Sequence, residues 1–166
     1  MDQGTALVGL IIILLCAIPF VLMGLASRNK KKKILNGLME TAVRNHCKIS
    51  RFELKNNFAI GIDDEAAMAF FKRNSKDSDV SQEVNLSEVQ RCRVYNSTRT
   101  TGSKGAANVV DRLELLFAFQ DKTKGDASFE IFNTNHGSLT LTGELQLAEK
   151  WAKIFNEKIA EKAKQK

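Results

Sequence analysis

The chain has little of the material from which most catalytic and metal sites are built: two histidines and three cysteines in 166 residues. Cys16, Cys47 and Cys92 are an odd number at wide spacing, which fits neither a disulfide framework nor a zinc site. Neither His46 nor His136 stands at a metal-ligand spacing. Free thiols suit a reducing compartment, so the composition favours a cytoplasmic domain.

The local motifs that resemble chemistry are incomplete. His46 and Cys47 are neighbours on a predicted helix, where adjacent side chains point apart and do not serve as base and nucleophile. Residues 101–105 lack the spacing of a phosphate-binding loop, and residues 63–65 lack the alternating ligands and glycine of a calcium loop. We predict no catalytic residue, no metal and no cofactor, and therefore a protein that is not an enzyme. The alternative is an enzyme with an unrecognised site.

Residues 6–26 contain no charged side chain. As a helix this run would span roughly 30 Å, the thickness of a bilayer core. Arg28, Lys30, Lys31, Lys32 and Lys33 follow it and indicate the cytoplasmic side. The sequence thus predicts a single transmembrane helix in the cell (inner or plasma) membrane, with residues 1–5 outside and the rest in the cytoplasm. The five cations are expected to contact anionic lipid headgroups.

A cleaved signal peptide, and hence an exported domain, is the alternative for this segment. Gly24-Leu25-Ala26 offers a small-x-small site, but the first five residues carry no basic side chain and the positive charge comes after the apolar run. An uncleaved anchor therefore fits the flanking charges better.

The net charge of +6 is of the sign that nucleic-acid-binding proteins carry. Asp2 contributes −1 and residues 28–33 contribute +5, which leaves +2 for residues 34–166. Because the excess charge belongs to the segment beside the predicted membrane, the sequence argues against nucleic acid as a partner.

Hydrophobic periodicity divides the rest of the chain. Residues 34–47 carry apolar side chains at helical spacing and predict an amphipathic helix that lies on the bilayer or packs on the domain. The period then changes to two, which predicts six or seven strands within residues 51–131. Residues 74–82 and 100–108 are expected to be loops. Thr142 is expected to cap a final amphipathic helix that buries Trp151, the only tryptophan.

This order of elements resembles the pleckstrin-homology (PH)-like superfold over about residues 48–160. Two patches resemble bacterial members of that group: Phe58-Ala59-Ile60-Gly61-Ile62-Asp63, and residues 84–94 with the sequence VNLSEVQRCRV. The resemblance implies an α+β domain, mainly antiparallel, in which a half-open barrel is capped by one C-terminal helix. It does not extend to phosphoinositide binding, because the expected basic loop is here Lys55-Asn56-Asn57, with one cation.

One surface remains as a candidate binding site. Arg91, Arg93, Tyr95 and Arg99 are predicted to share the outer face of one strand. Such a face is often merely solvated, but arginine and tyrosine are also the residues that interfaces favour. The sequence therefore predicts a single-pass membrane-anchored binding or scaffold module. Its PH-like domain would engage a membrane-associated protein of unknown identity or the inner membrane face.

Overall fold

The computed structural model describes residues 16, 18, 28–55, 57–74, 79–100, 108–136 and 140–165. Its elements are a helix described over residues 28–44 (the N-terminal helix), then β1 (Arg51–Leu54), β2 (Phe58–Asp63), β3 (Met68–Asn74), β4 (Asp79–Asn85), η1 (Leu86–Glu88), β5 (Val89–Thr100), β6 (Asn108–Phe119), β7 (Ala127–Asn133), η2 (Thr134–His136) and α2 (Glu144–Ala163). Two antiparallel sheets with a C-terminal helix confirm the predicted α+β class.

The predicted span at 6–26 falls outside the described residues apart from Cys16 and Ile18. Among the residues that are described, no helix is long and apolar enough to cross a membrane.

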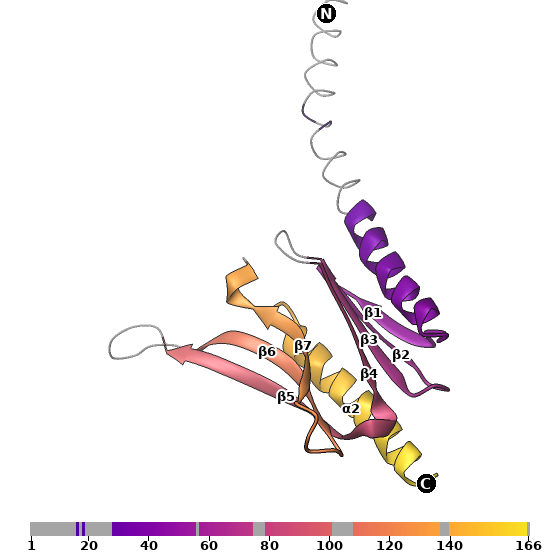
Figure 1. Ribbon diagram of the computed structural model, residues 1–166. Helices are drawn as coiled ribbons and strands as arrows, with labels where there is room; N and C mark the ends of the chain where they lie inside the picture. The colour runs from indigo at the N-terminus through magenta and orange to yellow at the C-terminus, as the bar shows by residue number, and fades with distance from the viewer. Residues whose placement is uncertain are drawn as a thin grey trace, which may run out of the picture.

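The strands form two sheets, with the order β1-β2-β3-β4 in the first and β5-β6-β7 in the second. All neighbours are antiparallel, and β5 and β6 pair along most of their length. The main core lies between the two sheets and α2, while the N-terminal helix covers the opposite face of the first sheet. Figure 1 shows this succession of layers, with the N-terminal helix in indigo on the outside.

Strand β2 is buried along its whole length because both of its faces are covered. Phe58, Ile60 and Ile62 point into the main core, and Ala59 points to the N-terminal helix. This is the two-face alternation of a strand, with the large side chains on the side where two sheets must be filled and a small one where a helix approaches.

The N-terminal helix buries one stripe, Ile34, Leu38 and Ala42, against Ala59 and Phe70 of the first sheet. The i, i+4, i+8 spacing places these residues on one face, and full burial of a residue such as Leu38 stabilises the fold by about 1.5–3 kcal/mol. Of the two placements that the sequence leaves open, the helix therefore packs on the domain. It is also longer at its start than the predicted 34–47, because the basic residues from Arg28 onwards are part of it.

Six aromatic rings connect the layers of the main core in a continuous series. The ring centroids of Phe71 in β3 and Phe129 in β7 are 5.2 Å apart, and those of Phe129 and Phe117 are 4.7 Å apart. Phe58 extends the series within the first sheet, and Phe155 and Trp151 extend it into α2. Offset and edge-on ring pairs of this kind add about 0.5–1.5 kcal/mol each beyond their buried area.

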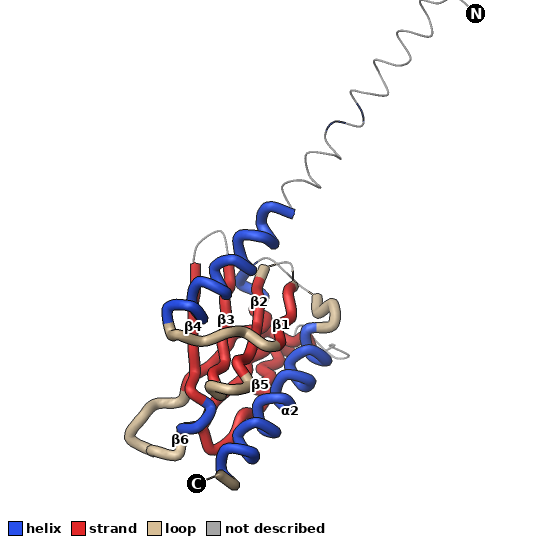
Figure 2. The backbone as a smooth tube through the Cα atoms, turned by 90° about the vertical axis from the view of Figure 1, so that its right-hand side faces the viewer, coloured by secondary structure: helices blue, strands red, loops and turns tan. Residues whose placement is uncertain are grey.

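Helix α2 lies beside β5 (Figure 2). Its apolar stripe, which includes Leu147, Trp151, Phe155 and Ile159, is buried in the main core as predicted. The Asn156 side-chain oxygen accepts a hydrogen bond from the Cys92 backbone N–H at 2.9 Å, and its amide nitrogen donates to the Cys92 carbonyl at 2.7 Å. One amide side chain thus satisfies both backbone groups of a residue in the outermost strand of the second sheet.

The predicted loop at 74–82 is wrong in its second half, because β4 begins at Asp79. Strand β4 has β3 as its only neighbour in the sheet, and of its seven residues only Val84 is buried. Its polar composition therefore reflects an outermost strand. After β4, Leu86 is fully buried in η1, whose first turn is capped by the Asn85 side chain.

The predicted cap of α2 is displaced by one residue. The N-cap is Gly143, with φ +97°, a left-handed conformation that favours glycine. The Thr142 hydroxyl donates instead to a Glu144 carboxylate oxygen at 3.0 Å, and the Thr142 backbone N–H donates to the same carboxylate.

Candidate functional site

Four side chains on the outer face of β5, here called the β5 strip, are exposed: Arg91, Arg93, Tyr95 and Arg99. Cys92, on the alternate face, is buried in the main core. Tyr95 keeps 46% of its surface exposed, and it is one of few large hydrophobic side chains among the described residues to do so. Exposure alternates along β5 from Arg91 to Tyr95, as predicted, whereas beyond Tyr95 both Asn96 and Thr98 are exposed as well as Arg99.

The cations of the strip differ in their surroundings. Arg99 forms an ion pair with Asp111 at 3.3 Å, whereas neither Arg91 nor Arg93 forms an ion pair within the described part of the chain. Their cross-strand neighbours in β6 are uncharged, since Arg91 lies opposite Ala118 and Arg93 opposite Leu116. The end of the strip near η1 thus carries two uncompensated positive charges beside an exposed aromatic ring.

The carboxylates near the strip are already occupied. Glu114, opposite Tyr95, is buried and pairs with Arg112 at 2.9 Å. Glu130 in β7 pairs with Arg112 at 3.1 Å and with Arg73 of β3. Neither carboxylate is therefore available to neutralise Arg91 or Arg93.

Arg73 and Glu130 join the two sheets. Arg73 is 3% exposed and donates to both the Glu130 carboxylate and the Glu130 backbone carbonyl. Burial alone would raise the pKa of Glu130, but the hydrogen bond from Asn133 and the charges of Arg73 and Arg112 outweigh it and hold this pKa below its ordinary 4.5. The pair's stabilisation is therefore complete above pH 4.5 and is lost as the pH falls through the lower folded-state pKa.

A second carboxylate connects β1 to α2. Glu53 accepts hydrogen bonds from Lys150 Nζ at 2.8 Å and Trp151 Nε1 at 3.2 Å. Burial opposes ionisation of Glu53, but these two donors and the nearby lysine charges prevail, so its pKa lies below 4.5. The ionised form is the one stabilised in the folded chain.

Protonating Glu53 should therefore be visible at Trp151, the only tryptophan. We expect a change in intrinsic fluorescence with a midpoint below pH 4.5, the direction given by the lowered pKa. Glu53→Gln should remove this titration, while Glu149→Gln, at an exposed position on α2, should preserve it. Identical titrations in Glu53→Gln and the unaltered chain would show that another group is responsible.

The thiols of Cys47 and Cys92 are not activated. Burial raises the pKa of Cys92 to about 12. Burial and the nearby carboxylates of Asp63 and Glu83 also raise the pKa of Cys47, whose Sγ donates to the Asn45 carbonyl at 3.3 Å. A raised pKa lowers the thiolate fraction at neutral pH, which is the opposite of what a nucleophile needs.

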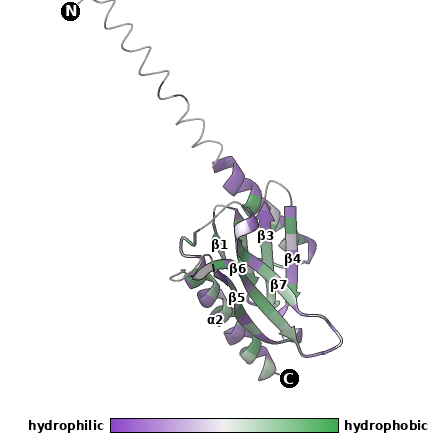
Figure 3. Ribbon diagram, turned by 90° about the vertical axis from the view of Figure 1, so that its left-hand side faces the viewer, coloured by the Kyte–Doolittle hydropathy of each residue, from purple (hydrophilic) through white to green (hydrophobic). Residues whose placement is uncertain are grey.

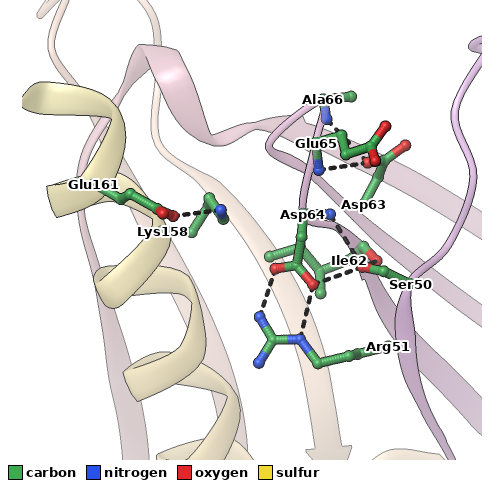
Figure 4. A network of polar contacts seen from close by, with 9 residues as sticks. All are labelled: Ser50, Arg51, Ile62, Asp63, Asp64, Glu65, Ala66, Lys158 and Glu161. Atoms are coloured by element: carbon green, nitrogen blue, oxygen red, sulfur yellow. Dashed lines mark hydrogen bonds and ion pairs between the residues drawn. The ribbon is translucent and has the colours of Figure 1, made fainter. Parts of the chain in front are cut away.

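The acidic turn after β2 is engaged in local structure (Figure 4). One Asp63 oxygen accepts from the backbone N–H groups of Glu65 and Ala66, both at 2.9 Å. Asp64 accepts from Ser50 at 2.6 Å and pairs with Arg51 at 2.5 Å. The described residues include no group of histidine, cysteine, aspartate and glutamate that could hold a metal ion.

The five predicted headgroup contacts lie in the described part of the chain. Arg28, Lys30, Lys32 and Lys33 are exposed at the start of the N-terminal helix, whose hydrophilic turns are visible in Figure 3. Lys31, the fifth predicted headgroup contact, is half-buried. The glycine-containing segment 101–105 lies outside the described residues.

One polar pocket was not anticipated from the sequence. It lies where β1, β3 and β7 end and α2 begins, and we call it the end pocket. Its charged lining consists of Lys31, Lys55, Arg73 and Glu144. These residues come from four separate elements or connections, so no local motif marks them.

No family model matches the chain, and comparison with curated proteins and with solved structures gives no match either.

Proposed function

We propose that the chain is a membrane-anchored, non-catalytic binding module whose β5 strip engages a membrane-associated protein with an acidic surface. The observation that carries this proposal is that Arg91 and Arg93 are exposed near Tyr95 and form no ion pair with any residue that the structure describes. Arginine and tyrosine are enriched among the residues that dominate binding energies at protein interfaces. The raised pKa values of Cys47 and Cys92 support a role without nucleophilic catalysis.

The arrangement of four strands, three strands and a C-terminal helix supports a PH-like domain with a half-open barrel. In this proposal the domain is a rigid platform. The strip stands on β5, whose other face packs in the main core through Cys92. Side chains held on a regular strand lose less conformational entropy on binding than side chains on a mobile loop.

The proposed anchor at 6–26 gives this platform its context. Confining the domain to a layer beside the cytoplasmic face of the membrane raises its effective concentration for partners in the same layer. A weak, largely electrostatic contact would then be sufficient, because neither partner has to be captured from dilute solution.

The test uses the full chain in its native membrane, with a photo-crosslinking amino acid in place of Tyr95. We expect a discrete crosslinked protein that is lost when Arg91→Glu and Arg93→Glu are combined, and that persists with Lys122→Glu, an exposed lysine in the β6–β7 turn. We expect the chain to stay in the membrane pellet after an alkaline carbonate wash.

Three results would contradict parts of this proposal. Crosslinks that are insensitive to the charge reversals would exclude the strip as the binding surface. Crosslinks to lipid alone would favour the membrane face as the ligand. Release by carbonate would exclude the anchor.

A further inference from the structure

The N-terminal helix carries a second apolar stripe that the domain does not cover. Leu35, Met39 and Val43 are spaced at i, i+4 and i+8, so they form one stripe beside the buried one. Leu35 and Met39 are half-buried. Val43 keeps 71% of its surface exposed, more than any other large hydrophobic side chain among the described residues. An exposed apolar stripe on a helix that already packs on a sheet indicates a second contact surface.

An exposed aromatic ring lies on the same side of the first sheet. Phe52 and Leu54 alternate with Glu53 along β1, so they share one face of this strand. Leu54 packs against the cluster beneath the N-terminal helix, whereas Glu53 contacts Trp151 of α2 on the opposite face. Phe52 is 47% exposed. It therefore adds to the apolar surface on the helix side of the sheet.

The N-terminal helix is also strongly basic. Residues 28–44 contain six cations and one carboxylate, Glu40, which gives a net charge of +5. The carboxylates of β4 beside the helix are engaged elsewhere, because Asp79 pairs with Lys72 and Glu83 accepts a hydrogen bond from Asn45. Four exposed cations at the start of the helix form no ion pair with any residue that the structure describes: Arg28, Lys30, Lys32 and Lys33.

We propose that the helix side of the first sheet lies flat on an anionic lipid bilayer, with the stripe of Leu35, Met39 and Val43 inserted at the membrane interface. Lys32 and Arg28, at i−3 and i−7 from Leu35, continue this stripe, so apolar insertion and contact with lipid phosphates come from one side of the helix. Such helices bind through buried apolar area and attraction to anionic headgroups. The charge of +5 favours lipid over a second copy of the chain, because two such helices repel each other.

This inference rests on the membrane localisation in the proposed function and adds the orientation of the domain. An upright helix would place Val43 about 22 Å from the level of Arg28, whereas a flat helix places both residues at the same depth. The layers then follow from the bilayer in the order N-terminal helix, first sheet, main core and second sheet. The N-terminal helix and β5 lie on opposite sides of the domain (Figure 1), so the β5 strip faces away from the lipid.

The experiment uses the full chain reconstituted into vesicles of phosphatidylcholine and phosphatidylglycerol. An environment-sensitive fluorescent amino acid replaces Val43 in one variant and Tyr95 in a second. Tyr95 is the matched control, because it is also an exposed large side chain and its neighbours in the β5 strip are also cations. Lipids brominated on the upper part of their acyl chains quench a fluorophore that reaches this depth. A carbonate wash of the same samples reports independently on the anchor.

We expect the brominated lipids to quench the fluorophore at position 43 and to leave the fluorophore at position 95 unchanged. Arg28→Glu combined with Lys32→Glu should abolish most of the quenching at position 43. Each cation near an anionic surface contributes about fivefold, so losing two weakens docking by at least about 30-fold. Lys122→Glu, at an exposed lysine in the β6–β7 turn, should leave the quenching unchanged.

The proposal is overturned if position 43 is not quenched in a chain that resists the carbonate wash, because the helix would then be upright while the proposed anchor stands. Equal quenching at positions 43 and 95, or quenching that survives the two charge reversals, would also overturn it. Emission at position 43 that changes with the protein-to-lipid ratio, and not with brominated lipid, would identify a second copy instead. Quenching at position 43 in a chain that carbonate releases would support the flat orientation and contradict the anchor.

Discussion

Replacing Glu130 by alanine is expected to lower the free energy of unfolding by about 3–5 kcal/mol, the usual cost of removing one partner of a buried ion pair. Arg73, at 3% exposure, would keep its charge in the interior without the carboxylate that now neutralises it. The effect should be large because Arg73 and Glu130 belong to different sheets. Denaturant unfolding followed by Trp151 fluorescence measures it.

Two further variants show whether the loss comes from the buried charge. Arg73→Met combined with Glu130→Leu should recover most of the stability, because replacing both members of a buried pair by apolar side chains is often neutral or favourable. Arg99→Ala breaks the exposed pair with Asp111 and should change the free energy of unfolding by less than about 1 kcal/mol. If Glu130→Ala were no worse than Arg99→Ala, the pair would not stabilise the contact between the sheets.

Replacing Phe129 by alanine should also be severe, at about 3–5 kcal/mol of unfolding free energy. Its fully buried ring stacks on Phe71 of the other sheet, meets Phe117 edge-on, and lies 6.4 Å from Phe155 of α2. Removing it leaves a cavity at the point where the two sheets and α2 meet. The surroundings are unable to close this cavity without moving one of the three layers.

The matched control for this cavity is Phe52→Ala in β1. Phe52 is 47% exposed and is not part of either buried cluster, so its removal should cost less than about 1 kcal/mol. Thermal or denaturant unfolding of the two variants under the same conditions gives the comparison. Equal destabilisation would mean that the aromatic series does not hold the layers together.

The sequence predicts best the elements that have one buried face and one face toward solvent. In β6 and β7, apolar side chains that pack in the main core alternate with more polar ones on the opposite face, so their hydrophobic residues follow a period of two. The same alternation indicates which side chains of β5 are exposed. Helix α2 is predicted for the corresponding reason at a period of 3.6, with Trp151 inside.

Prediction fails where the environment comes from distant segments. Strand β4 reads as a loop, because a strand with one neighbour needs few apolar residues. The end pocket escapes detection because Lys31, Lys55 and Arg73 belong to separate segments. The buried state of Arg73 is equally hidden, because its carboxylate partner is 57 residues away. Only the packing of the two sheets brings these groups together.

The hydrogen bonds of Asn156 to Cys92 restrict how β5 can recognise another molecule. An outermost strand normally offers its backbone to an added strand, which is a route both to peptide binding and to aggregation. Here α2 occupies that edge at Cys92, and one amide takes the two hydrogen bonds that an incoming strand would need there. A molecule that binds β5 therefore contacts the side chains on the outer face of this strand. Adding a strand to the sheet past Cys92 would require α2 to detach first.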